Sequence, residues 1–369
     1  MKTVPLESIS LETAMSYQFR FIDCIMHHFT GSQILACGDL GVVKGLNKPE
    51  TTQKVEKVIA EFFNAEKALL VRGSGTNAIR YALHACLSCN DTLLVHKAPI
   101  YPTTQTSITM LGLRVVEADY NNLEEVKQTL KKYPEIKGVL IQYTRQNVED
   151  SYSMQEVIDV IKSQSNAAII TDDNYAVMKV KSIGVELKAD LSCFSTFKLL
   201  GPEGIGCIVG KASYIDALAK QMYSGGLQCQ GWEALEVLRG LVYAPVSLAI
   251  QGQTIEECHR RLQMQKELPE VKGAYIVNGQ SKILLVEFYE DIAQDILNYA
   301  QTLGALPYPV GAESKYEMCP LFYKISGTFA AGNPSLAKRA IRINPNRAGA
   351  DTIIRVLKES LEGIKYVSK

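Results

Sequence analysis

The chain has 369 residues, of which 47% are hydrophobic and 21% charged, so it can bury a large core and has room for more than one domain. Lysine plus arginine and aspartate plus glutamate each number 39, which gives a formal net charge of zero. This balance provides no basic field of the kind that holds nucleic acid, and no apolar run reaches transmembrane length. We therefore expect neither nucleic acid nor a membrane as a partner.

The cysteines and the first residues bear on the cellular compartment. Nine cysteines, an odd number, are scattered along the chain, which does not suggest a disulfide framework and favours a reducing compartment. The first fifteen residues contain no apolar signal core, so we expect a cytoplasmic protein. Cys86 and Cys89 form a CxxC pair that would suit a redox site, but they lie on a helical pattern, and no second cysteine pair completes a zinc site. We interpret them as packed residues and predict no metal site.

Helical patterns and short apolar runs alternate from residue 51 onward. Strands are predicted at 67–71, 91–96, 113–119, 137–143, 167–173, 191–196 and 206–210. This alternation is typical of an α/β domain with a mostly parallel sheet covered by helices on both faces. Ligands of such sheets bind beyond the carboxyl ends of the strands, where the unusual polar residues of this sequence also lie.

The pattern changes after about residue 212. Helical segments dominate, with strands predicted at 281–289 and 340–345, which indicates a smaller α+β domain. One long helical pattern contains Pro245, where we expect a kink or a break. The predicted organisation is an N-terminal arm at 1–50, a large domain at 51–245 and a small C-terminal domain at 246–369.

The first two strand ends offer an anion site and an aromatic ring. Ser74, Gly75 and Thr76 follow a strand and open a helix, so backbone N–H groups, hydroxyls and the helix N-terminus can face an anion. The alternative is an ordinary turn with Thr76 as the N-cap. Tyr101 lies just past the next strand, where it can stack on a planar ligand or simply pack.

The next strand ends carry two carboxylates and an amine. Asp172 and Asp173 end an apolar strand, where a carboxylate needs a cation or a donor unless it only forms a turn. Lys198 follows Ser195 at the end of another short strand. A lysine held in a cleft is partly desolvated, and desolvation favours the neutral, nucleophilic amine that forms Schiff bases. The alternative is a solvated surface charge.

Together these groups match the needs of pyridoxal 5′-phosphate, namely a phosphate cradle, a ring-stacking aromatic, a carboxylate and an amine. The stretch "DDNYAV…KADLSCFSTFK", with "IYPTT", "VLRGL" and "IRINPNRAGADTIIRVLKESL", resembles fold type I pyridoxal-phosphate enzymes. The resemblance is to the Cys/Met-metabolism branch, which includes cystathionine synthases and lyases and methionine γ-lyase. "FSTFKLLGPEGIGCIVG" also resembles the lysine loop of selenocysteine synthase and class V aminotransferases.

The resemblance implies roles for individual residues. Lys198 would form the Schiff base with the cofactor, Asp173 would pair with the pyridine nitrogen and Tyr101 would stack on the ring. The phosphate would be held by Ser74, Gly75, Thr76 and Ser195. Arg342 would bind the substrate carboxylate, with Arg347 as a competing candidate.

Two segments depart from the Cys/Met pattern. The Tyr-x-Arg of that branch is replaced by Val42 and Lys44, and Lys44 could replace the arginine as a point charge. The segment "QYTRQN" replaces Glu-x-Pro-x-Asn-Pro. Within it Gln146 or Asn147 is a weak candidate for the cofactor's phenolic oxygen, and Arg145 could face the substrate.

The resemblance also implies an enzyme that removes the Cα proton of an amino acid. We favour elimination or replacement of the Cys/Met type, with an aminotransferase as the runner-up; a racemase stays open, as does a pyridoxal-phosphate-binding protein without turnover. The resemblance implies a homodimer or homotetramer. The sequence does not name the amino acid.

Overall fold

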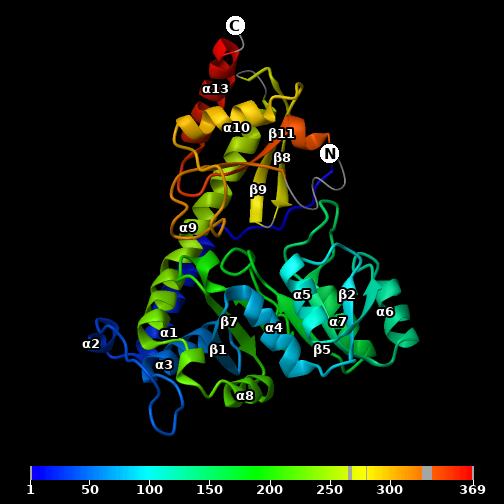
Figure 1. The fold of residues 1–369 in the computed structure, drawn as a ribbon, viewed down its shortest axis with the longest axis vertical. Coiled ribbons are helices and arrows are strands. Elements are labelled where there is room, and N and C mark those ends of the chain that lie inside the picture. The colour runs from blue at the N-terminus through cyan, green and yellow to red at the C-terminus, as the bar shows by residue number, and fades with distance from the viewer. Residues whose placement is uncertain (1, 265–267, 280, 326–334, 368–369) are drawn as a thin grey trace. The chain divides into compact units, whose positions relative to one another are not determined.

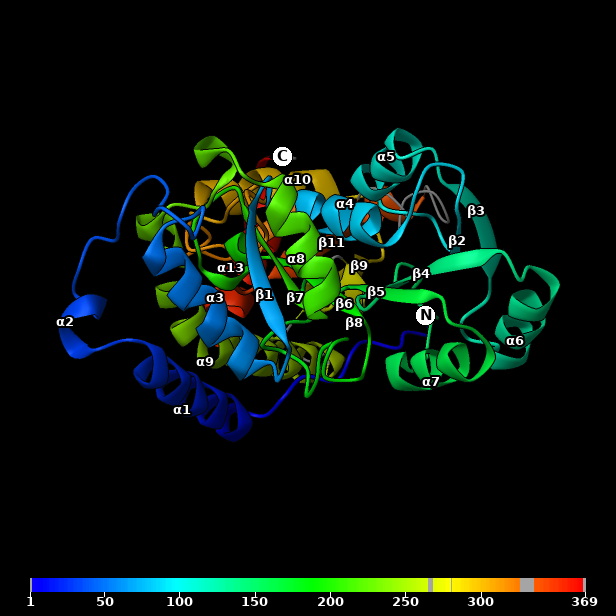
Figure 2. The same cartoon turned by 90° about the horizontal axis from the view of Figure 1, so that it is seen from below.

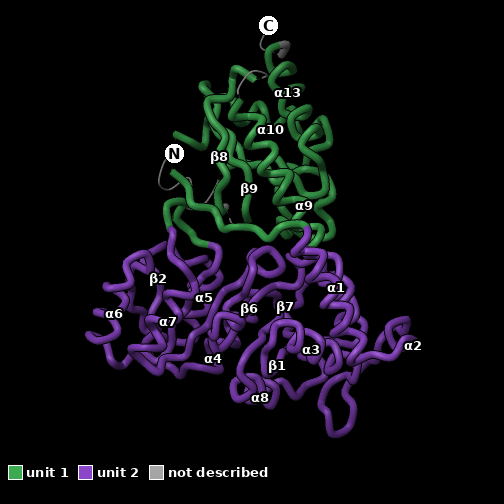
Figure 3. Tube along the Cα trace, turned by 180° about the vertical axis from the view of Figure 1, so that it is seen from behind, with its two compact units in different colours: residues 1–11, 145–150, 246–369 green, residues 12–144, 151–245 purple. Residues whose placement is uncertain are grey.

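The computed structural model describes residues 2–264, 268–279, 281–325 and 335–367. Its residues fall into two compact units, each assembled from separate stretches of the chain (Figure 3). Unit 1 consists of residues 1–11, 145–150 and 246–369, and unit 2 consists of residues 12–144 and 151–245. The domain boundaries expected near residues 50 and 245 stay predictions.

Unit 2 is built on a seven-stranded sheet with the order β1-β7-β6-β5-β4-β2-β3. The strands are β1 (Lys67–Arg72), β2 (Thr92–His96), β3 (Arg114–Ala118), β4 (Ile136–Gln142), β5 (Ala168–Asp172), β6 (Leu191–Ser195) and β7 (Ile205–Gly210). The neighbours from β3 to β6 are parallel, whereas β7 runs antiparallel to both β6 and β1. The mostly parallel α/β sheet predicted from the sequence is confirmed.

Helices cover both faces of this sheet because successive strand residues point to opposite sides. Leu93 and Ile170 pack with α4 and α8, whereas Leu94 and Ile169 pack with α6 and α7. Figure 2 shows α4 and α5 on one side of β4 and β5, and α7 on the other. The helices of unit 2 are α1 (Leu11–His28), α2 (Gly31–Ile34), α3 (Glu50–Phe62), α4 (Ser74–Cys86), α5 (Pro102–Met110), α6 (Leu123–Lys132), α7 (Met154–Gln164) and α8 (Ala212–Gln221).

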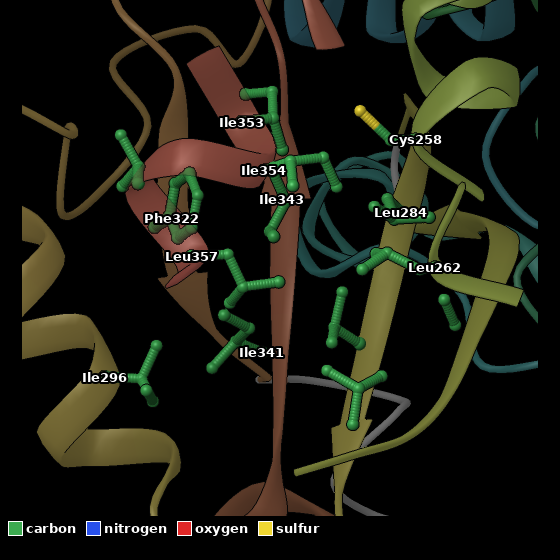
Figure 4. Packing of buried hydrophobic residues seen from close by; sticks show 14 of the residues in the cluster. Cys258, Leu262, Leu284, Ile296, Phe322, Ile341, Ile343, Ile353, Ile354 and Leu357 are labelled. Atoms are coloured by element: carbon green, nitrogen blue, oxygen red, sulfur yellow. The ribbon is translucent and has the colours of Figure 1, made fainter. Parts of the chain in front are cut away.

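Unit 1 contains a four-stranded antiparallel sheet with the order β10-β11-β9-β8. Its elements are β8 (Val271–Gly279), β9 (Ser281–Phe288), α10 (Ala293–Thr302), β10 (Leu321–Lys324), α12 (Leu336–Arg339), β11 (Ala340–Asn344) and α13 (Ala350–Val367) (Figure 1). Apolar residues of β11, α10 and α13, among them Ile296, Ile341 and Leu357, form one buried cluster (Figure 4). The sequence pattern predicted β9 and β11 but missed β8 and β10.

The helix α9 (Gly231–Gln263) is continuous through Pro245, so the chain does not break there, and a kink at this proline stays a prediction. A proline inside a helix removes one backbone donor and clashes with the preceding turn. Here Leu241, Ala244 and Leu248 on the surrounding turns are almost fully buried, and this packing holds the helix together across the proline. In the part of the chain that the structure describes, every helix is too short or too polar to cross a bilayer.

Candidate active site

The register of the sheet brings residues from distant parts of the sequence to one edge. Ser195, the last residue of β6, pairs with Gly206, and Arg72 at the end of β1 pairs with Ile205. The carboxyl end of β5 lies beside β6 at the same edge, since Asp172 pairs with Cys193. The start of α4 and the turn that contains Lys198 follow directly from these strand ends.

The start of α4 has an unusual backbone. Gly73 and Ser74 both have left-handed φ angles, of 96° and 60°, and both N–H groups donate to the carbonyl oxygen of Gly204, at 2.7 and 2.9 Å. Gly73 is the N-cap residue, so Thr76 lies inside the first turn and its hydroxyl instead donates to Thr103 at 3.3 Å. A helix start leaves the N–H groups of its first turn without intrahelical acceptors, and these attract anions.

Two hydroxyls of the predicted phosphate cradle meet at this helix start. The Oγ atoms of Ser74 and Ser195 lie 2.6 Å apart, although the residues are 121 positions apart in the sequence. The close packing needs glycine nearby, because a Cβ at Gly206 would lie 2.2 Å from the carbonyl oxygen of Ser74. A Cβ at Gly75 would lie 2.7 Å from Oδ1 of Asn174. The structure thus brings Ser74, Gly75 and Ser195 together, and their role in holding a phosphate stays a prediction.

Asn174 connects three elements of the site and was missed in the sequence. Its Oδ1 accepts a hydrogen bond from the N–H of Ser195 at 2.9 Å, and its Nδ2 donates to Oδ1 of Asp172 at 2.8 Å. Its own N–H also donates to Asp172, at 3.1 Å. An asparagine directly after two aspartates at a strand end favours such a turn, and this was the available signal.

The two aspartates at the end of β5 have different surroundings. Asp173 is fully buried, and it accepts hydrogen bonds from the Thr171 hydroxyl at 2.7 Å and the Gly184 N–H at 3.4 Å. Burial raises the pKa of the Asp173 carboxyl to about 7. Burial also raises the pKa of Asp172, but the charge of Lys198 and the hydrogen bonds from Asn174 oppose this rise. The positive charge of Lys198 therefore favours the ionised form of the Asp172 carboxyl.

Lys198 lies in a 3-10 turn, Thr196–Leu199, directly after β6. Its side chain is half-buried, and its Nζ lies 3.9 Å from the ring centroid of Tyr175, within the range of a cation–π contact. A second lysine, Lys179, is buried with its Nζ 5.6 Å from the same ring. Tyr175 has a left-handed φ of 64°, which is rare for an aromatic residue and typical of functional sites. Lys198 is thus held against an aromatic ring and is not a free surface charge.

Tyr101 immediately precedes α5, where it acts as the N-cap residue, and it is 38% exposed. The ring that lies against Lys198 belongs instead to Tyr175. The stacking role of Tyr101 therefore stays a prediction, and Tyr175 is the aromatic residue that the sequence analysis overlooked. Its signal was its position two residues after Asp173, at the end of the same strand.

Arg342, the predicted carboxylate ligand, lies on β11 in unit 1 and is 6% exposed. Its Nε and Nη2 donate to the carbonyl oxygen of Lys324 at 3.1 and 2.9 Å, and its Cζ lies 4.1 Å from the ring centroid of Tyr323. Arg342 and Tyr323 line a cavity of about 500 Å³ beside α10. The competing Arg347 donates to Gln251 at 3.4 Å, and burial lowers its pKa. The role of Arg342 as the ligand of the substrate carboxylate, with Arg347 as the competing candidate, stays a prediction.

The departures from the Cys/Met pattern have local explanations. Lys44 is exposed on the loop before α3. The Nη1 of Arg145 donates to the backbone carbonyls of Val4 and Asp150 at 3.0 and 3.1 Å, so this guanidinium joins the 145–150 loop to the N-terminal segment of unit 1. Asn147 is also bound locally, since its N–H donates to Asp150 at 3.1 Å. These contacts favour a structural role for Arg145 and Asn147.

The described residues contain no group of three or more side chains suited to a metal ion. Cys86 and Cys89 are free thiols, and burial raises the pKa of Cys86 to about 12, which keeps its thiol protonated and unreactive at neutral pH.

Comparisons with known proteins place the chain among relatives. Residues 45–236 match the family model of class-V aminotransferases, and residues 256–357 match the model of the YhfS-like, C-terminal domain. Over 365 residues the chain is 50% identical to the protein YhfS of Escherichia coli (strain K12), and the match covers 99% of this chain and 100% of YhfS.

Solved structures show the same fold. The crystal structure of the pyridoxal-5′-phosphate-dependent protein YhfS from E. coli matches with a TM-score of 0.96, covering 98% of this chain and 100% of that one. A carbon-sulfur lyase involved in aluminum resistance from Clostridium novyi NT has a TM-score of 0.71 at 18% identity, over 96% and 91% of the two chains. Cystathionine gamma synthase from Xanthomonas oryzae pv. oryzae reaches 0.66 at 16% identity, over 89% and 91%. The resemblance to the fold type I pyridoxal-phosphate enzymes is confirmed, and the solved structures of the Cys/Met branch share this fold.

We predict that Gly75→Ala lowers the free energy of unfolding by about 1–3 kcal/mol, because the new methyl group overpacks the start of α4. The Asn174 amide can move away only by giving up its bonds to Ser195 and Asp172.

Gly252→Ala is the matched control, since this glycine is also helical but its Cβ would make an ordinary 3.5 Å contact with Ser8. The control should gain up to about 1 kcal/mol from helix propensity. Urea unfolding compares the two, and equal changes would contradict the crowding at Gly75.

We also predict that Asp173 makes stability depend on pH. Its folded pKa is about 7 against an ordinary value of 3.8, so between these values the folded state binds more protons than the unfolded state. The stabilising contribution of protonated Asp173 to the free energy of unfolding is complete below its ordinary pKa of 3.8. This contribution is lost as the pH rises through about 7. The free energy of unfolding of the wild type, measured relative to Asp173→Asn, should therefore fall between pH values of about 4 and 7 and then level off. Parallel pH profiles for the two proteins would show that Asp173 titrates normally.

Proposed function

Since the chain belongs to the class-V aminotransferase family and has the fold type I architecture of pyridoxal-phosphate enzymes, we propose that it uses Lys198 to act on an amino acid. The proposed reaction is elimination or replacement of a β- or γ-substituent, as in Cys/Met metabolism. The observation that carries the proposal is the placement of Lys198, half-buried against Tyr175 at the end of β6, beside the start of α4 and the carboxylates of β5.

The cofactor is pyridoxal 5′-phosphate, and the residues of unit 2 fit each part of it. The first turn of α4, with the paired hydroxyls of Ser74 and Ser195, suits a phosphate group. A nucleophilic amine is present in Lys198, and Asp172 and Asp173 supply carboxylates at the end of β5. The glycines at positions 75 and 206 let the Asn174 side chain and the Ser74 backbone pack closely at this edge.

These residues have distinct tasks in the proposed reaction. Bound pyridoxal phosphate supplies an aldehyde that takes up the substrate amine and a ring that accepts the electrons of the broken Cα–H bond. The amine of Lys198 removes the Cα proton, which requires its neutral form. The carboxylates at the end of β5 hold a proton at the ring nitrogen, and Ser74, Thr76 and Ser195 bind the phosphate. Tyr101 remains our candidate for stacking, and Arg342 for the substrate carboxylate.

Tyr175 supports elimination over simple proton transfer. Elimination of a side-chain substituent needs a proton donor for the leaving group in addition to the base at Cα. The phenol of Tyr175 belongs to the ring that Lys198 contacts, so two proton-carrying groups lie side by side. The runner-up is an aminotransferase, because the family model that covers residues 45–236 is that of class-V aminotransferases.

We predict that the purified protein with added pyridoxal phosphate shows an absorbance band near the visible edge that borohydride removes. Lys198→Ala should lack this band, because the only change is the amine that bonds to the cofactor. Lys179→Ala is the matched control, since this second lysine approaches the same ring but lies farther from it. Equal bands in the wild type and in Lys198→Ala would show that the lysine assignment is wrong.

A panel of amino acids then tests the reaction. Keto acid formed without an added acceptor supports elimination, whereas keto acid that requires a 2-oxo acid acceptor supports the aminotransferase. A bound cofactor with neither product would show a binding protein without turnover, and the proposed reaction would be wrong.

We further propose that the protein is a homo-oligomer and that α1 contributes to the interface. Met15, Phe19, Ile22 and Met26 recur at helical spacing and are 43%, 58%, 37% and 70% exposed. An exposed apolar stripe of this kind is typical of a surface that a second copy covers.

Phe19→Glu should therefore shift the protein toward the monomer, because it places a charge in the apolar stripe of α1. Lys131→Glu on α6 is the control for an exposed site outside the stripe. Light scattering coupled to size-exclusion chromatography measures the mass of each protein. An unchanged oligomer in Phe19→Glu would place the interface elsewhere.

A further inference from the structure

The side chains at the end of β5 divide between two faces of the sheet. Asp172 pairs with Cys193, whose Sγ lies 3.6 Å from the carbonyl oxygen of Ala78 in α4. Ser195, two residues after Cys193, points to the same face and meets Ser74 at the start of α4. Asp172 therefore faces the side of the sheet on which the phosphate cradle is built.

Asp173 faces the other way. Its carboxylate shares a polar cluster with Thr171 and Ser192, whose hydroxyls lie 3.0 Å apart, and with the N–H of Gly184. A Cβ at Gly184 would lie 2.0 Å from the Thr171 hydroxyl, so this cluster is closely packed. Hydrogen bonds reach both carboxylate oxygens of Asp173 from within the protein.

Asp172 is oriented differently. The hydrogen bonds that the structure gives to Asp172 come from the N–H and the Nδ2 of Asn174, and both go to Oδ1. Oδ2 therefore stays available on the face that carries Ser195. The same Asn174 accepts the N–H of Ser195, whose hydroxyl meets Ser74. A continuous chain of hydrogen bonds thus runs from the Asp172 carboxylate to the start of α4.

From this geometry we infer that Asp172, and not Asp173, is the carboxylate that binds the ring nitrogen of pyridoxal phosphate, and that Asn174 is the residue that positions it. The inference rests on the proposed function. It corrects the role that the motif gave to Asp173, which becomes a buried structural carboxyl. Asn174 links the carboxylate at one end of the cofactor site to the phosphate cradle at the other.

The charges around the pair agree with this division. Lys198 is the charged group that favours ionised Asp172, whereas the neighbouring charge that acts on Asp173 is Asp172 itself, which opposes ionisation. A carboxylate that holds a protonated ring nitrogen must itself be ionised. Asp172 meets this condition better than Asp173.

The experiment compares Asp172→Asn with Asp173→Asn, an isosteric pair of variants at adjacent positions. Pyridoxal phosphate affinity is measured by titration, and the absorbance of the bound cofactor is followed against pH. Asp172→Asn should weaken binding by about 10- to 100-fold, the worth of one hydrogen bond to a charged group. It should also move the pH at which the absorbance changes by about one unit or more. Asp173→Asn should keep the wild-type pH profile and bind within about threefold of wild type.

Asn174→Ala is the second variant, and it keeps the test decisive if Asp172→Asn does not fold. Loss of the positioning amide should shift the absorbance profile in the same direction as Asp172→Asn, by a smaller amount. A general loss of packing would lower stability without moving this profile. An unchanged profile in Asn174→Ala would overturn the positioning role.

The remaining outcomes separate the inference from the proposed function. A larger shift in Asp173→Asn than in Asp172→Asn, or equal shifts in both, would overturn the assignment of Asp172 while leaving Lys198 in place. A wild-type protein that gives no borohydride-sensitive band would overturn the proposed function, and the inference with it.

Discussion

The amide of Asn174 is the interaction on which the candidate active site depends. Its two polar ends bind different partners, Asp172 at the end of β5 and the backbone of Ser195 at the end of β6. Its position is fixed in turn by Gly75, which allows α4 to begin directly against it. One planar side chain thereby sets the spacing of a carboxylate, a hydroxyl pair and a helix N-terminus. The position of Lys198 is also set by this arrangement, because its turn continues directly from β6.

The electrostatics of the site follow from burial. Two aspartates at the end of an apolar strand lose most of their hydration, and burial raises the pKa of both. The Thr171 hydroxyl and the Gly184 N–H compensate the lost hydration of Asp173. The Asn174 amide and the charge of Lys198 compensate that of Asp172.

Local signals were sufficient for much of this protein. Alternating elements predicted the parallel sheet, and the glycine turns predicted where Ser74 and Lys198 lie. The sequence analysis chose Asp173 over Asp172 from the motif, although the choice depends on the register of β5 against β6 and on the face that each side chain takes. Tyr175 was missed because its position after Asp173 was its only signal, and the sequence does not mark its left-handed backbone. The strand β8 was missed because its two glycines and its asparagine weaken the strand pattern, and the packing that continues α9 through Pro245 is tertiary.

The N-terminal segment and the loop at residues 145–150 belong to the same unit as the last third of the chain. The N–H of Leu6 donates to the side chain of Asn278, 272 residues later, and the N–H of Val4 donates to the carbonyl of Val148 at 3.0 Å. During synthesis the first residues leave the ribosome long before these partners exist. Unit 2 can begin to fold on its own sequence, whereas Leu6 can form its hydrogen bond only after Asn278 has been synthesised. The contacts that fix these early residues thus depend on a late part of the chain.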